Sequence, residues 1–104
     1  MQYAVYRNQN STSKKRFPFL LDVQAELLAD LETRVVIPLA SAVLYSEKVL
    51  TQLTPIVQFE GGDYVLVTPQ MAGVARRELG PKIGNLAEAR YSVIAALDFL
   101  LTGV

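Results

Sequence analysis

Two chemically versatile side chains are missing from this sequence: its 104 residues include no cysteine and no histidine. Without cysteine the chain can form neither disulfides nor thiolate metal sites, and this composition suits a reducing cytosol. Without histidine it lacks the side chain that proteins use most often for proton transfer and for metal binding. The two absences together make a metal centre or an acid–base catalytic site hard to build.

The sequence also lacks an excess of charge, since ten lysines and arginines balance ten aspartates and glutamates. No global field attracts nucleic acid, so we do not expect direct nucleic-acid binding by the chain alone, and a charged partner would need a local patch. Membrane-spanning apolar runs are absent too, because Asp98 interrupts the run near the end of the chain. The first residues do not resemble a signal peptide, so we expect no membrane contact and a cytoplasmic location.

Short β-like segments fill most of the chain, which fits a single domain over residues 1–104. The patterns predict strands near residues 2–7, 17–24, 33–39, 53–59, 64–68 and 74–79, with Pro38 ending the third and residues 80–84 leading into a helix. The segment Glu60-Gly61-Gly62-Asp63 predicts a hairpin turn, because both glycines can adopt positive φ. Five or six strands followed by a helix indicate a mainly β, α+β fold with an antiparallel sheet curled towards a barrel.

The last twenty residues predict one long helix. Asn85 can cap its start, with Glu88 as the capping-box partner, and Gly103 suits the position just past its end. Apolar residues recur at three- and four-residue steps in two neighbouring rows, Leu86, Val93, Leu97 and Leu100 in one and Ile94 and Leu101 in the other. The two rows together make an apolar surface that is wider than packing against one core requires. We therefore expect the helix to contact a second neighbour, most simply another copy of the chain or a partner protein.

Two further segments are not explained by a core. Leu27 and Leu28 are adjacent in the short connection after the second predicted strand, so both cannot point into one core. They form either a contact surface or part of a loop folded over the core. The polar segment 8–16 ends in Lys14, Lys15 and Arg16, which form either a solvated loop tip or, together with Arg7, a landing site for an acidic peptide.

Several short motifs, in shared order and spacing, resemble the CcdB family of plasmid and chromosomal toxins. They are the opening Met1-Gln2-Tyr3, residues 19–24 with Asp22-Val23-Gln24, the run Val36-Ile37-Pro38-Leu39-Ala40-Ser41-Ala42, Met71-Ala72, and a helix closing on glycine plus a β-branched residue. The match covers nearly the whole chain. Each motif alone would be a weak signal, and the similarity lies in their combination.

This resemblance implies a small homodimer with an SH3-like antiparallel barrel, a small side sheet and a long C-terminal helix. It implies a type II toxin that binds the A subunit of DNA gyrase and traps the enzyme on cleaved DNA, and that a cognate CcdA-like antitoxin neutralises. The setting it implies is plasmid maintenance, with toxin and antitoxin regulating their own transcription. It implies no enzyme activity, no catalytic residues, no cofactor and no metal.

Carried over by position, the resemblance implies a gyrase-binding set made of Ala25, Leu27, Leu28, Asp98, Leu101, Thr102, Gly103 and Val104. In the family's best-known pattern a tryptophan precedes the terminal glycine, whereas Thr102 occupies that place here. A stacking contact with an arginine of gyrase is therefore not available to this chain. The antitoxin-binding set that we expect consists of Arg7, Lys14, Lys15 and Arg16.

Two other functions compete with the gyrase poison. MazF and Kid-like toxins share the fold class and cut RNA, so a sequence-specific endoribonuclease is the alternative. Its acid–base groups would have to come from Glu60, Asp63, Arg76, Arg77 and Glu78. Arginine is a poor proton shuttle and the neutral net charge does not favour RNA, which weakens this alternative. A purely structural dimer without a target is the third.

Overall fold

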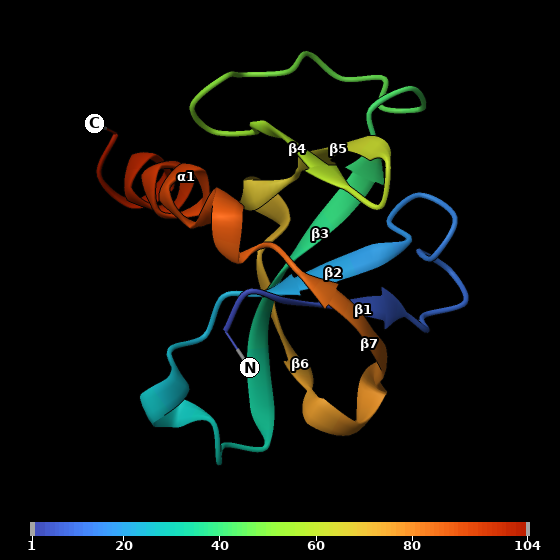
Figure 1. Ribbon diagram of the computed structural model, residues 1–104, viewed down its shortest axis with the longest axis vertical. Helices are drawn as coiled ribbons and strands as arrows, with labels where there is room; N and C mark the ends of the chain where they lie inside the picture. The colour runs from blue at the N-terminus through green and yellow to red at the C-terminus, as the bar shows by residue number, and fades with distance from the viewer. Residues whose placement is uncertain (1, 104) are drawn as a thin grey trace.

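The computed structural model describes residues 2–103 and consists of a curled antiparallel sheet followed by a C-terminal helix (Figure 1). Within these residues the strands are β1 (Ala4–Asn8), β2 (Phe19–Asp22), β3 (Thr33–Ser41), β4 (Ile56–Phe59), β5 (Gly62–Leu66), β6 (Ala72–Ala75) and β7 (Leu79–Asn85). The helix α1 spans Arg90–Thr102, and 3₁₀ turns span Glu26–Leu28, Thr68–Gln70, Arg76–Glu78 and Ala87–Ala89. The prediction of a mainly β, α+β fold is confirmed.

The sheet follows the strand order β4-β5-β3-β2-β1-β7, and β6 pairs with the first part of β3. Along one edge, β3 pairs with two different strands in turn. Residues 33–36 pair with β6, and residues 39–41 pair with β5. Pro38 lies between these pairings, and its carbonyl accepts a hydrogen bond from the Val67 N–H at 3.0 Å. The prediction that Pro38 ends the strand is wrong, because a residue without an N–H is tolerated where β3 changes partners.

The main core lies between the sheet and α1. It contains Val5, Leu21, Ile37, Leu39 and Leu66 from the sheet, and Val93 and Ala96 from the helix. Along β3 the side chains alternate between the two faces, so Ala40 belongs to a second cluster with Phe17, Val65 and Val67. Covering both faces of the central strands in this way fixes their register.

The hairpin between β4 and β5 is present, but its turn is one residue earlier than expected. Glu60 and Gly61 have φ values of 50° and 77°, while Phe59 pairs with Gly62. A two-residue turn of this kind needs positive φ at both central residues. The hairpin prediction is confirmed, and the expected positive φ at Gly62 is replaced by one at Glu60.

The segment before the helix differs most from the prediction. Residues 79–85 form β7, which pairs with β1, where the sequence predicted the end of a strand, a connection over residues 80–84 and the helix cap Asn85. Asn85 is still part of this strand, and its Oδ1 accepts a hydrogen bond from the Ala87 N–H at 3.0 Å. This bond starts the 3₁₀ turn Ala87–Ala89, so the regular helix begins only at Arg90.

Candidate functional site

An apolar turn projects from the sheet immediately after β2. Ala25 is exposed there, and Glu26–Leu28 form a 3₁₀ turn without a buried side chain. The side chain of Leu27 is 97% exposed and that of Leu28 is 48% exposed. Two neighbouring leucines in water are costly, so the structure favours a contact surface over a loop folded onto the core. We call residues 25–28 the leucine turn.

Buried polar side chains lie directly behind the leucine turn. Arg34 Nε donates to Asp22 Oδ2 at 2.8 Å, Arg34 Nη2 lies 2.7 Å from the same oxygen, and both residues are almost completely buried. Asp22 Oδ1 accepts a hydrogen bond from the Gln24 N–H at 3.0 Å. The sequence placed Asp22 and Gln24 in a motif but predicted no role for them. The available signal was a pair of opposite charges inside two segments that were predicted to be strands.

A phenol lies close to this ion pair. Burial raises the pKa of Tyr6 above its ordinary value of 10.0, and the negative charge of Asp22 raises it further. The neighbouring Arg34 opposes this effect by lowering the pKa. Tyr6 follows the buried Val5 along β1, so its side chain lies on the sheet face opposite the main core.

The C-terminal end of α1 is closed by a glycine, as predicted. Gly103 has a φ of 76°, and its N–H donates to the carbonyl of Phe99 at 2.8 Å. Thr102 Oγ1 donates to the carbonyl of Asp98 at 2.6 Å, which orients this side chain along the helix. Asp98 and Thr102 are exposed, and Leu101 is 71% exposed. Val104 lies outside the described residues.

The two predicted apolar rows of the helix have different surroundings. Leu86 and Val93 are buried in the core, whereas Leu100 of the same row is exposed in this single chain. Ile94 and Leu101 of the second row are exposed, and Tyr91 extends this outer face. The helix therefore has one covered face and one free apolar face, as its wide hydrophobic arc predicted.

Within one chain the expected gyrase-binding residues fall into two separate groups. The leucine turn lies beyond the end of β2, while Thr102 and Gly103 lie at the far end of α1 (Figure 1). The figure places these two segments well apart on the same side of the molecule. The structure thus exposes each group but does not bring them together.

The expected antitoxin-binding cations are also divided. Arg7 and Lys14 line one hollow of about 380 Å³ together with Asn8 and Gln9. The guanidinium of Arg16 lies 4.9 Å from the ring centre of Phe17 and lines a different hollow, and Lys15 is exposed on the loop. Arg7 and Lys14 are therefore the two cations of this cluster that share a surface.

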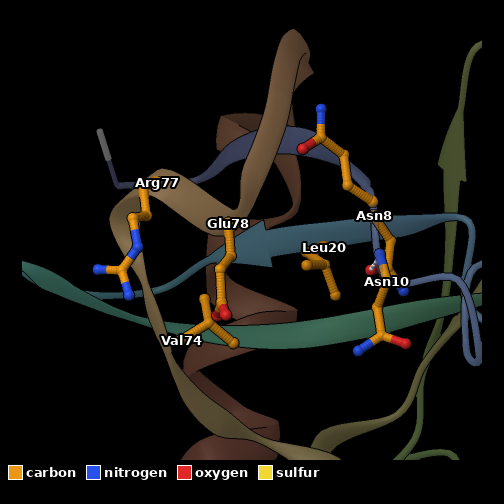
Figure 2. A pocket seen from close by; sticks show the side chains of 7 residues that line it. Asn8, Asn10, Leu20, Val74, Arg77 and Glu78 are labelled. Carbon is orange, nitrogen blue, oxygen red and sulfur yellow. Dashed lines mark hydrogen bonds between the residues drawn. The ribbon is translucent and has the colours of Figure 1, made fainter.

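A neighbouring hollow of about 420 Å³ shares Asn8 and Gln9 with the first. Figure 2 shows Arg77, Glu78 and Val74 on one side, Asn8 and Asn10 on the other, and Leu20 between them. Arg77 adds a positive charge to this second hollow, beside the negative charge of Glu78, whereas the sequence suggested Arg77 only for the ribonuclease. Its placement depends on the 3₁₀ turn Arg76–Glu78 after β6, which the sequence did not predict.

The groups proposed for an endoribonuclease are not assembled into one site. Glu60 and Asp63 lie on the β4–β5 hairpin, whereas Arg76, Arg77 and Glu78 lie between β6 and β7. The two regions are well separated in Figure 1. Acid–base catalysis needs its groups within hydrogen-bonding reach of one substrate, so this arrangement does not favour the alternative.

Two further features bear on possible ligands. Among residues 2–103, no cluster of three histidine, cysteine, aspartate or glutamate side chains is placed to hold a metal ion. In the same part of the chain, no helix combines the length and apolar character needed to cross a membrane. The exposed leucine turn, the free end of α1 and the hollow lined by Arg7 and Lys14 remain as surfaces that can contact a partner.

The comparison with protein families agrees with these features. The family model described as CcdB protein matches residues 2–103, which is almost the full length of the chain. The match includes the leucine turn, the loop with Lys14 and the whole of α1. A match of this extent shows that the chain belongs to the CcdB family of toxins from toxin–antitoxin systems.

Proposed function

We propose that this toxin binds the dimerisation domain of the A subunit of bacterial DNA gyrase and traps the enzyme on cleaved DNA. The observation that carries the proposal is the leucine turn, whose two apolar side chains project into water from a turn without a buried residue. The exposed end of α1, with Asp98, Leu101 and Thr102, provides the second contact surface. Membership of the CcdB family supports gyrase as the target.

Binding would require adhesion and no bond-breaking by the toxin. Leucine side chains that leave water on binding contribute about 1.5 to 3 kcal/mol each when fully buried. Thr102 cannot stack on an arginine, and its hydroxyl is already bonded to the Asp98 carbonyl. The leucine turn would therefore contribute a large share of the affinity in this chain.

The active form in this proposal is a cytoplasmic homodimer. The outer face of α1 supports this, because the apolar side chains of Tyr91 and Ile94 are exposed there, before the end of the helix that is assigned to gyrase. A second copy is the simplest partner for such a face. Two copies would also present two leucine turns and two helix ends to one target.

A cognate CcdA-like antitoxin would neutralise the toxin through a flexible acidic segment. Such a segment gains affinity and association rate from complementary charge. Arg7 and Lys14 on one hollow, with Arg77 on the adjoining hollow, support this location. Lys15 and Arg16 would add charge at the edge of the same loop.

A DNA cleavage assay tests the proposed function. Supercoiled DNA is incubated with gyrase, with the toxin, and with both, and the products are separated after denaturation of the proteins. We expect linear DNA only when gyrase and toxin are both present, and antitoxin should suppress it. Intact DNA in the combined reaction, together with specific fragments when the toxin is incubated with RNA, would instead support the endoribonuclease.

A further inference from the structure

Gln24 connects the leucine turn to the sheet. Its side chain is buried, and its Nε2 donates to the carbonyl of Leu28 at 2.9 Å. Its Oε1 accepts a hydrogen bond from the N–H of Val35 in β3 at 3.0 Å. One carboxamide thus joins the last residue of the turn to a strand that is eleven residues away from Gln24 in the sequence.

Gln24 is itself held by the buried ion pair. Its backbone N–H donates to Asp22 Oδ1, while the other carboxylate oxygen of Asp22 bonds to Arg34. The N–H of Val23 donates to the carbonyl of Val35 at 3.0 Å, which continues the pairing of β2 with β3. The carboxamide therefore projects from a backbone that is hydrogen-bonded at Val23 and at Gln24 itself.

This arrangement matters because the leucine turn has no hydrophobic anchor. None of the residues Glu26–Leu28 is buried, and even Leu28 is 48% exposed, so packing contributes little to their position. The internal bonds of the turn, from Leu28 N–H to the Ala25 carbonyl and from Ala29 N–H to the Glu26 carbonyl, shape it but do not attach it to the sheet. Gln2 adds a second attachment, since its backbone N–H donates to the Glu26 carboxylate.

Burying polar groups here has a cost that an apolar core would avoid. Buried ion pairs contribute little net stability compared with well-packed apolar residues, whereas their hydrogen bonds fix directions. A turn that is ordered before binding loses less conformational entropy when a partner arrives. Both considerations point to a positioning role for Gln24.

We infer that Gln24 is a positioning residue that holds Leu27 and Leu28 in the geometry in which they contact gyrase. This inference rests on the proposed function. It assigns a role in binding to a side chain that lies behind the contact surface and does not itself reach the partner.

Amide hydrogen exchange tests the positioning role without gyrase. Gln24→Met keeps the volume of the side chain and removes both of its hydrogen bonds. We expect the amides of Leu28, Ala29 and Leu31 to exchange about tenfold faster in this variant, while those in the β4–β5 hairpin are unchanged. The matched control is Thr54→Val, because Thr54 is a buried polar residue whose Oγ1 accepts a hydrogen bond from the Leu50 N–H in another loop. Thr54→Val should leave exchange in the leucine turn unchanged.

A double-mutant cycle then tests the connection with binding. We expect Gln24→Met to weaken binding of the gyrase A dimerisation fragment about tenfold in the otherwise unchanged chain. In a chain that also carries Leu27→Ser and Leu28→Ser, Gln24→Met should weaken it no further. Gln24→Ala serves as a second variant, with circular dichroism confirming the fold of each protein.

The outcomes separate this inference from the proposed function. Unchanged exchange in the leucine turn, or an equal loss of affinity in both backgrounds, would overturn the positioning role of Gln24. If Leu27→Ser and Leu28→Ser do not affect binding, the proposed contact surface itself is wrong, and the binding role of Gln24 falls with it. Faster exchange in the leucine turn, combined with no further loss of affinity when Gln24→Met is added to Leu27→Ser and Leu28→Ser, supports both the contact surface and the positioning role of Gln24.

Discussion

Gly84 lies against the ring of Phe59, so close that a β-carbon on Gly84 would be 2.8 Å from the ring atom Cε1. The two residues belong to β7 and β4, which are the two ends of the strand order. Phe59 also makes an edge-to-face contact with Phe19, with ring centres 5.5 Å apart. The absence of a side chain at Gly84 thus lets the curled sheet bring its two ends together over an aromatic cluster.

Gly84→Ala should destabilise the fold because the added methyl group must displace the Phe59 ring. Overpacking of this kind typically costs about 1 to 3 kcal/mol. Urea unfolding followed by circular dichroism measures the change. Gly73→Ala is the matched control, since a methyl group on that strand glycine would meet no atom within 4 Å beyond its chain neighbours, and it should be close to neutral. Equal stabilities for the two variants would contradict the close contact.

The glycines and the proline of β7 explain why the sequence did not predict this strand. Gly80, Pro81 and Gly84 have the composition of a loop, yet Gly80 lies so close to the Arg7 carbonyl that a β-carbon would be 2.7 Å from it. A glycine that permits close approach and a glycine that permits a turn look identical in a sequence. By contrast, the hairpin at Gly61 and the helix end at Gly103 depend on local φ preferences, and both were predictable.

In the candidate site, too, features that depend on tertiary contacts could not be predicted from the sequence. The exposure of Leu27 and Leu28 follows from two adjacent apolar residues in a short connection, which is a local pattern. The pairing of Asp22 with Arg34 depends on the register of β2 against β3 and is not visible locally. The sequence therefore offered the exposure of these leucines as one of two alternatives, and it did not predict the buried polar groups behind them.

Arg34→Met should destabilise the protein strongly, because it leaves the buried carboxylate of Asp22 without its guanidinium. Removing one partner of a buried ion pair costs about 3 to 5 kcal/mol. Urea unfolding at neutral pH measures the loss. Adding Asp22→Asn should recover part of it, since the amide oxygen can still accept the hydrogen bond from Gln24 N–H without carrying a charge. A double variant that is less stable than Arg34→Met would contradict this interpretation.

The phenol of Tyr6 should make stability depend on alkaline pH. Because burial raises its pKa, the folded protein holds this proton more tightly than the unfolded chain does. The stabilisation is complete below the unfolded value of 10.0 and is lost as the pH rises through the folded-state pKa. The free energy of unfolding should therefore fall more steeply above pH 10 in the unchanged protein than in Tyr6→Phe. Parallel pH profiles would exclude this contribution.

Charge reversal should identify the antitoxin surface. Arg7→Glu with Lys14→Glu changes both cations of one hollow, so it should weaken antitoxin binding more than Lys15→Glu with Arg16→Glu. It should also reduce the dependence of the affinity on salt concentration. Calorimetric titrations at two ionic strengths measure both effects, with Lys48→Glu, on the loop between β3 and β4, as the control. Affinity and salt dependence that do not change in either double variant would place the antitoxin elsewhere.

The central claim is that this toxin acts by apolar contact with gyrase through the leucine turn and the end of α1. Titration of the gyrase A dimerisation fragment with four chains tests it most directly: the full chain, one lacking residues 102–104, one with Leu27→Ser and Leu28→Ser, and one with Val43→Ser. Val43 is 90% exposed on another loop, so its variant controls for the loss of an apolar side chain as such. We expect the truncated chain and the double variant to bind at least tenfold more weakly than the full chain, and Val43→Ser to bind equally well. Equal binding by all four chains, or no binding by the full chain, would contradict the proposed function.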